Sequence, residues 1–165
     1  MRVLGVDLGS KRIGLAISDE AGEFAFPAGI VDSRGRKRDI GVLRELIREK
    51  GIGRAVVGLP IHMDGRRGPE AERAVRFAND LATSAGIPVD TLDERWTSRE
   101  AERVLQQQHT SKKRGARRRK AGVVDEMAAS IILRTYLAQL DLARREAAEQ
   151  NPVETDASDP ADASE

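Results

Sequence analysis

The chain has 165 residues, of which 39% are apolar and 33% charged, so it is long enough for one globular domain with its own core. It contains no cysteine, which excludes disulfides and thiolate-bound metals, and no apolar run approaches the roughly 20 residues of a membrane span. Residues 1–145 hold all 28 basic and 20 of the 27 acidic residues, a net charge of +8 that favours polyanionic partners. The N-terminus lacks the apolar core of a signal peptide, so a cytoplasmic location is expected.

The first third of the chain predicts three strands followed by a helix. Short β-branched or apolar runs predict strands at 2–7, 13–18 and 24–31, the first two joined by a turn at 9–11. Pro27 places the third strand at a sheet edge or a bulge. A 3.6-residue apolar period predicts a helix at 36–50, which Gly51 ends.

The remaining chain alternates strands and helices. We expect strands at 54–59 and 87–92, helices at 69–85, 97–108 and 123–142, a loop at 60–68 and a basic loop at 111–120. This order predicts a mixed five-stranded α/β sheet, antiparallel on one side and parallel on the other, with helices on both faces. Residues 1–142 would form the domain. Residues 143–165 would form an acidic, disordered tail, because they carry almost no large apolar side chain.

Asp7 is the first candidate site residue, because it closes the first strand within Gly5-Val6-Asp7-Leu8-Gly9. An ionised carboxylate near the centre of a sheet is costly unless it is paired or binds a cation. The flanking glycines leave the backbone open to a ligand. The alternative is an Asp that only accepts hydrogen bonds within a turn.

Two further carboxylates complete the candidate site. Glu94 follows the fifth strand, where ligands of parallel sheets gather, although an acid here could also serve only the helix dipole. Asp125 begins the last helix on a face of small apolar residues that includes Ala128, Ala129 and Ile132. A solvent-facing Asp is the alternative there. Three oxygen ligands suit Mg²⁺ or Mn²⁺, and two such ions could hydrolyse a phosphodiester.

A basic segment precedes the helix that carries Asp125. Most runs of charged residues are only solvated surface. The density of basic residues here, beside a carboxylate site, favours contacts to phosphates. We expect nucleic-acid contacts from Lys112, Lys113, Arg114, Arg117, Arg118, Arg119 and Lys120. Lys11 and Arg95, near Asp7 and beside Glu94 in the sequence, are expected to add to them.

Taken together, four motifs closely resemble the YqgF/RuvX family over about residues 1–140. They are 5–16 (GVDLGSKRIGLA), 57–60 with 63–65 (VGLP, MDG), 93–98 (DERWTS) and 124–129 (VDEMAA). The resemblance implies an RNase H-like fold, a carboxylate metal site formed by Asp7, Glu94 and Asp125, and a cytoplasmic nuclease that matures the 5′ end of precursor 16S rRNA. Members usually carry a basic residue where this chain has Val123, and Lys120 stands nearby.

Three other functions are compatible with the sequence. A Holliday junction resolvase would fit the same resemblance, as would a non-catalytic nucleic-acid-binding module on the same fold. An ATP-binding protein of the actin and sugar-kinase class shares the Asp-x-Gly hairpin, but it needs two such domains around its nucleotide. Resolvases act as symmetric dimers, and no sequence feature decides between a monomer and a homodimer.

Overall fold

Five strands form one mixed sheet in the computed structural model, which describes residues 1–97 and 120–150. The strands are β1 (Arg2–Leu8), β2 (Arg12–Ser18), β3 (Ala25–Asp32), β4 (Ile52–Leu59) and β5 (Val89–Asp93). They lie in the order β3-β2-β1-β4-β5. β1, β2 and β3 pair antiparallel, whereas β1, β4 and β5 pair parallel, which confirms the predicted sheet. β3 is an edge strand with a register shift beside Pro27, as its proline requires.

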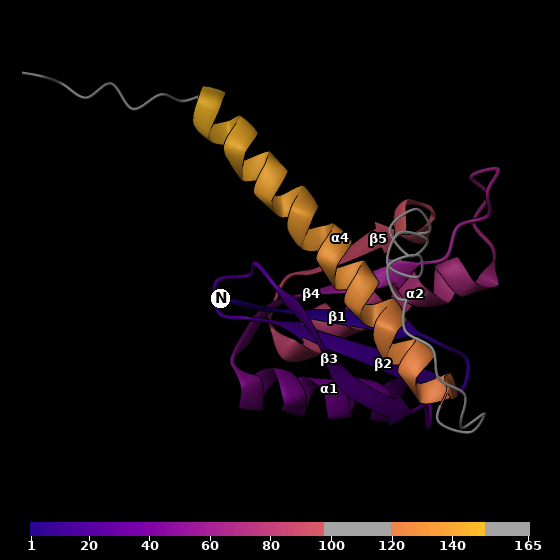
Figure 1. Cartoon of the computed structure of the whole chain (residues 1–165). Coiled ribbons are helices and arrows are strands. Elements are labelled where there is room, and N and C mark those ends of the chain that lie inside the picture. Colours follow the sequence, from indigo (N-terminus) through magenta and orange to yellow (C-terminus); the bar gives the residue numbers. More distant parts are fainter. Residues whose placement is uncertain (98–119, 151–165) are drawn as a thin grey trace, which may run out of the picture.

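Helices cover both faces of this sheet (Figure 1). Helices α1 (Arg36–Lys50) and α2 (Pro69–Ala85) pack on one face, and the long α4 (Lys120–Gln150) crosses the other. Gly51 and Gly86 end the first two helices in the left-handed conformation that glycine adopts without strain. A single 3₁₀ turn, η1 (Glu94–Trp96), follows β5. Among the described helices, none combines the length and apolar character needed to cross a membrane.

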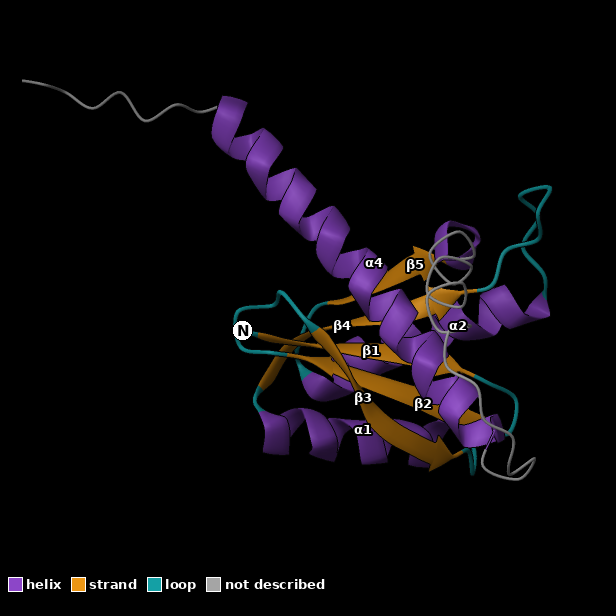
Figure 2. Cartoon of the chain, viewed as in Figure 1, coloured by secondary structure: helices purple, strands orange, loops and turns teal. Residues whose placement is uncertain are grey.

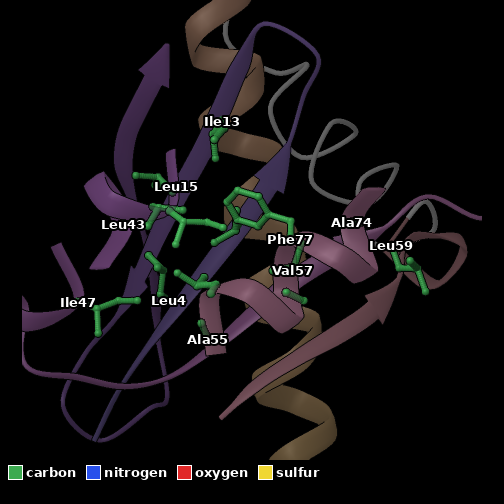
Figure 3. Packing of buried hydrophobic residues seen from close by; sticks show 14 of the residues in the cluster. Leu4, Ile13, Leu15, Leu43, Ile47, Ala55, Val57, Leu59, Ala74 and Phe77 are labelled. Atoms are coloured by element: carbon green, nitrogen blue, oxygen red, sulfur yellow. The ribbon is translucent and has the colours of Figure 1, made fainter. Parts of the chain in front are cut away.

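Alternation along the strands builds two cores. In β1, Leu4 and Val6 face α1 and α2, whereas Val3 faces α4. The larger core is centred on Phe77 of α2, which is 1% exposed. Figure 3 shows its ring among the side chains of the sheet and of Leu43 from α1. On the α4 face of the strands, Gly5, Gly14 and Gly58 carry no side chain, and this lets the helix approach the sheet closely.

A polar network fixes α4 at the end of the sheet where the parallel strands begin. Arg54 donates from Nη1 to Asp90 Oδ2 over 2.9 Å and to the Tyr136 hydroxyl oxygen over 3.1 Å. The Tyr136 hydroxyl in turn donates to Asp90 Oδ2. These contacts join β4, β5 and α4, and burial is the main cause that raises the pKa of Tyr136. The helix is therefore anchored by side chains at this end and by backbone packing nearer its start.

Most predicted bounds agree with the structure, and those of α1 and α2 are identical to it. The expected helix at 97–108 lies outside the described residues except for Thr97, and the expected basic loop at 111–120 except for Lys120, which belongs to α4 and not to the loop. α4 begins three residues before its predicted start and ends eight residues beyond its predicted end. The expected disorder was therefore wrong for 143–150, because alanine, arginine and glutamate favour a helix without needing a core to cover it. This end of α4 projects from the body (Figure 1).

Candidate active site

The fold brings the three predicted carboxylates to one edge of the sheet. Asp7 is the penultimate residue of β1, and Glu94 follows β5 directly. Because β1, β4 and β5 are parallel, their carboxyl ends lie at the same edge. Alternation in β1 places Asp7 on the face that α4 covers, and Asp125 lies near the start of that helix.

Two glycines on the same face make room for the other two acids. Gly14 of β2 is the cross-strand partner of Asp7, and a Cβ at Gly14 would clash with the backbone carbonyl of Asp125. A Cβ at Gly58 of β4 would clash with Oε1 of Glu94. The helix backbone thus rests on β2 at the neighbour of Asp7, and the Glu94 carboxylate occupies the space above β4. Both contacts depend on the absence of a side chain.

The electrostatics show that this edge concentrates negative charge in poorly solvated surroundings. Burial, and then the nearby charge of Asp125, raise the pKa of Asp7. Burial raises the pKa of Glu94 to about 7, with further contributions from Asp7 and Asp93. Each shift reports a carboxylate whose ionised form lacks compensation from solvent or from a cation. Asp7 interacts with both of the other acids, so the three form one electrostatic unit.

Arg12, the first residue of β2, partly compensates this charge. Its Nε lies 3.0 Å from Oδ2 of Asp125, an ion pair in which both side chains are partly exposed. The same oxygen is itself buried and accepts no hydrogen bond from the described residues. The contact therefore has ion-pair distance without hydrogen-bond alignment, and the oxygen keeps its lone pairs for another partner.

The oxygen donors of these residues suit a hard divalent cation, although their side chains do not converge on one binding position. Within residues 1–97 and 120–150, no group of three or more histidine, aspartate and glutamate side chains is close enough to hold a metal as it stands. The charges of Asp7 and Asp125 repel one another, and Asp125 pairs with Arg12. The donors are all oxygen, one is buried without a hydrogen bond, and two have raised pKa values, which suits Mg²⁺ or Mn²⁺.

The predicted nucleic-acid contacts are only partly within the described residues. Lys11 is exposed in the β1–β2 turn. The Arg95 guanidinium is held by Asp93, with Nη2 and Oδ2 2.6 Å apart, so its charge is largely used within the protein. Lys120 is the first residue of α4. Lys112, Lys113, Arg114, Arg117, Arg118 and Arg119 lie outside the described residues, and their role stays a prediction.

Sequence reasoning missed four residues that shape this edge. Gly14 and Gly58 allow the close approaches, and Arg12 pairs with Asp125. Arg73 of α2 donates from Nη2 to the carbonyl oxygen of Gly9, which ties α2 to the turn after Asp7. An isolated glycine inside each strand was the available signal for the first two, since such glycines often mark a close backbone approach. The arginine contacts join distant segments and leave no local signal.

This sheet order, with helices on both faces and acids at the ends of β1 and β5, defines an RNase H-like protein. Solved structures agree on the fold. The chain is similar to Thermus thermophilus RuvC in complex with Holliday junction substrate, with TM-score 0.55, 16% identity, and 86% of this chain and 96% of that chain covered. It is also similar to the fowlpox virus Holliday junction resolvase, with TM-score 0.50, 17% identity, and 84% and 99% covered.

The family is set by sequence. The family model described as RuvX, Holliday junction resolvase, matches residues 1–139, and the chain belongs to this family. A relative from Pelotomaculum thermopropionicum is 43% identical over 153 residues, covering 92% of this chain and 96% of the relative. A relative from Symbiobacterium thermophilum is 44% identical over 137 residues, covering 83% and 92%. Both carry the name pre-16S rRNA nuclease.

Proposed function

We propose that this protein is a divalent-metal-dependent nuclease that processes the 5′ end of precursor 16S rRNA in the cytoplasm. Membership of the RuvX family and the nuclease name shared by its relatives make it a hydrolase of phosphodiester bonds. The observation that carries the proposed site is the gathering of Asp7, Glu94 and Asp125 at one sheet edge, from three distant parts of the chain.

The proposed ligands are the three carboxylates, with Asp7 between the other two. When bound, Mg²⁺ or Mn²⁺, in one or two ions, supplies Lewis-acid stabilisation of the charge that develops on the phosphate oxygens. Asp7 and Glu94 are held by strand ends, and Asp125 by a helix pressed on Gly14, so their positions are set by rigid elements. This rigidity orients the scissile phosphate rather than merely attracting it.

The cations around the edge complement an anionic substrate. Arg12 balances Asp125, so the site is less repulsive to a phosphate than three free carboxylates would be. Lys11, which is exposed, directly precedes Arg12 in the sequence, and the predicted basic segment 112–120 precedes Asp125. Both add positive charge next to site residues. Contacts of this kind position a polymer without reading its sequence.

A Holliday junction resolvase is the second candidate, because the family model carries that description and the RuvC complex has the same fold. That activity requires a symmetric dimer that matches the two-fold symmetry of the junction. A non-catalytic binding module is disfavoured, since such a module has no need to keep three mutually repelling acids together.

Comparing substrates tests this proposal directly. The protein is incubated with a 16S precursor RNA and, separately, with a four-way DNA junction, each with Mg²⁺, Mn²⁺ or EDTA. We expect metal-dependent shortening of the RNA at its 5′ end and no paired, symmetric incision of the junction. Symmetric junction cleavage without RNA processing would replace the rRNA assignment by the resolvase. Binding of both substrates without cleavage of either would favour the non-catalytic module.

A further inference from the structure

The connection between β3 and α1, together with the first turn of α1, carries a dense group of exposed cations that the proposed site does not use. Arg34, Arg36, Lys37 and Arg38 are all exposed. Arg36 is paired with Asp80 of α2, with Nε and Oδ2 3.1 Å apart. Within the part of the chain that the structure describes, the other three form no ion pair. Arg34 and Arg38 line an open hollow that also contains Asp32 and Glu45, but no salt bridge among the described residues fixes either guanidinium there, so both stay available to a phosphate.

Hydrogen bonds hold this connection firmly against the β1–β2 turn. Ser33 donates its backbone N–H to the carbonyl oxygen of Lys11 over 2.9 Å. Its hydroxyl donates to Oδ2 of Asp39 over 2.7 Å, and the backbone N–H of Arg34 donates to Oδ1 over 2.9 Å. Asp39 is only 3% exposed, so its carboxylate serves this anchor and not the solvent-facing cations. The cations thus stand on a rigid base that also carries Lys11.

The same contacts place the cations at the sheet edge that carries the carboxylates. Arg12 is paired with Asp32 in the β2–β3 ladder, and it contacts Asp125. Figure 2 shows the β3–α1 connection on the same side of the molecule as the start of α4. Two strand spacings separate β1 from β3, so the connection that begins after β3 lies on the order of 10–15 Å from Asp7. α1 packs on the sheet face opposite α4, so a nucleic-acid backbone would pass from the carboxylates around this end of the sheet to reach the cations.

We infer that Lys11, Arg34, Lys37 and Arg38 form a second phosphate-binding surface, which holds the nucleic-acid backbone on one side of the scissile phosphate. This inference rests on the proposed function, since it extends the substrate path from that site. Exposed lysines and arginines without an aromatic side chain among them favour contacts to phosphates over stacking on bases. Along a duplex, which rises about 3.4 Å per nucleotide, the surface would reach phosphates roughly three to five nucleotides from the cleavage position.

The test compares two triple variants of the full chain. In both, the substituted residues lie in α1 or just before it. One variant combines Arg34→Gln, Lys37→Gln and Arg38→Gln. The matched control combines Arg44→Gln, Arg48→Gln and Lys50→Gln, which removes the same charge near the far end of α1. Arg34 anchors the connection through its backbone N–H, so the substitutions keep those hydrogen bonds. Equal melting temperatures check this, and Lys37→Glu provides a single exposed substitution as a second probe.

Binding of a labelled 16S precursor RNA is measured by anisotropy between about 50 and 200 mM salt. The first variant should lower the salt slope of log K by up to about two units and weaken binding on the order of tenfold at the low-salt end, whereas the control should match the wild type. An RNA shortened to two nucleotides on one side of the cleavage position should remove this difference. If the first variant had the affinity and salt slope of the wild type, or if the control lost as much as the first variant, the proposal of a second phosphate-binding surface would be wrong, and the proposed function would be unaffected. A wild-type protein that binds no RNA would overturn the proposed function as well.

Discussion

The backbone carbonyl of Asp125 lies directly against Gly14, which is the residue paired with Asp7 across β1 and β2. Gly14 therefore sets how closely α4 approaches the sheet, and it brings Asp7 and Asp125 together. The same arrangement recurs at Gly58, whose missing side chain leaves space for the carboxylate of Glu94. The geometry of the site therefore depends on these two glycines as well as on the acids themselves.

Substituting Gly14 by alanine tests this packing. The added methyl group would meet helix backbone, which cannot rotate away, so we expect a loss of about 1–3 kcal/mol in the free energy of unfolding. The control is Gly41→Ala in α1, where no atom lies within 4 Å and helix propensity should raise stability by about 0.5–1 kcal/mol. Urea unfolding measures both. A Gly14→Ala protein as stable as the wild type would show that α4 does not rest on this glycine.

Replacing Glu94 by glutamine should remove a pH-dependent destabilisation of the folded chain. The pKa of Glu94 is about 7 in the folded chain and 4.5 when the side chain is fully solvated, as in the unfolded chain, so the unfolded chain ionises first as the pH rises. Folding then carries a penalty that is absent below about pH 4.5, grows towards pH 7 and stays constant above it. With EDTA present, Glu94→Gln should therefore be more stable than the wild type at pH 8 and equal to it near pH 4.5. Unfolding curves at both pH values measure this. A stability difference that is the same at both would contradict the raised pKa.

Metal affinity should depend on pH for the same reason. A cation must displace the proton that Glu94 holds below about pH 7, so Mn²⁺ affinity should fall about tenfold per pH unit below that value and level off above it. The raised pKa of Asp7 acts in the same direction. Calorimetric titration of the wild type with Mn²⁺ from pH 5.5 to 8 measures the trend. Glu94→Gln should bind more weakly and lose most of the pH dependence. A flat profile in the wild type would remove Glu94 from the ligands.

The basic segment 112–120 gives a separate prediction about substrate binding. Replacing Arg117, Arg118 and Arg119 with glutamine should weaken RNA and DNA binding alike, because contacts to phosphates carry no sequence information. The salt slope of log K should fall by up to about two units. Titration of labelled RNA and DNA across a salt series measures it, with nucleotide affinity as the control for an ATP-binding protein. Salt slopes that remain parallel to the wild type would exclude this segment as a contact.

Local patterns were sufficient for much of the fold. The bounds of α1 and α2 follow from an apolar period and a terminal glycine, both of which act within a few residues. The division of the sheet into an antiparallel and a parallel side follows from general rules on connections between neighbouring elements. The end of α4 was missed because residues 143–150 form a helix without burying a face, so no apolar period marks them.

The site was predictable as a set of acids but not as a geometry. Asp7, Glu94 and Asp125 stand out because a carboxylate at a strand end or on an alanine-rich helix face is unusual. The ion pair of Arg12 with Asp125 joins residues 113 positions apart, and only the assembled fold brings them within 3.0 Å. Contacts of that kind depend on how elements pack, which no local pattern records.

The most direct test of the account is cleavage of a 16S precursor RNA by the wild type and by four single variants with Mg²⁺ or Mn²⁺. Asp7→Asn, Glu94→Gln and Asp125→Asn should each abolish cleavage while remaining folded. Glu126→Gln, which removes the same charge one position beyond Asp125, should cleave like the wild type. Near-wild-type cleavage by any of the first three would remove that residue from the site, and equal activity in all four would contradict a carboxylate metal site at this edge.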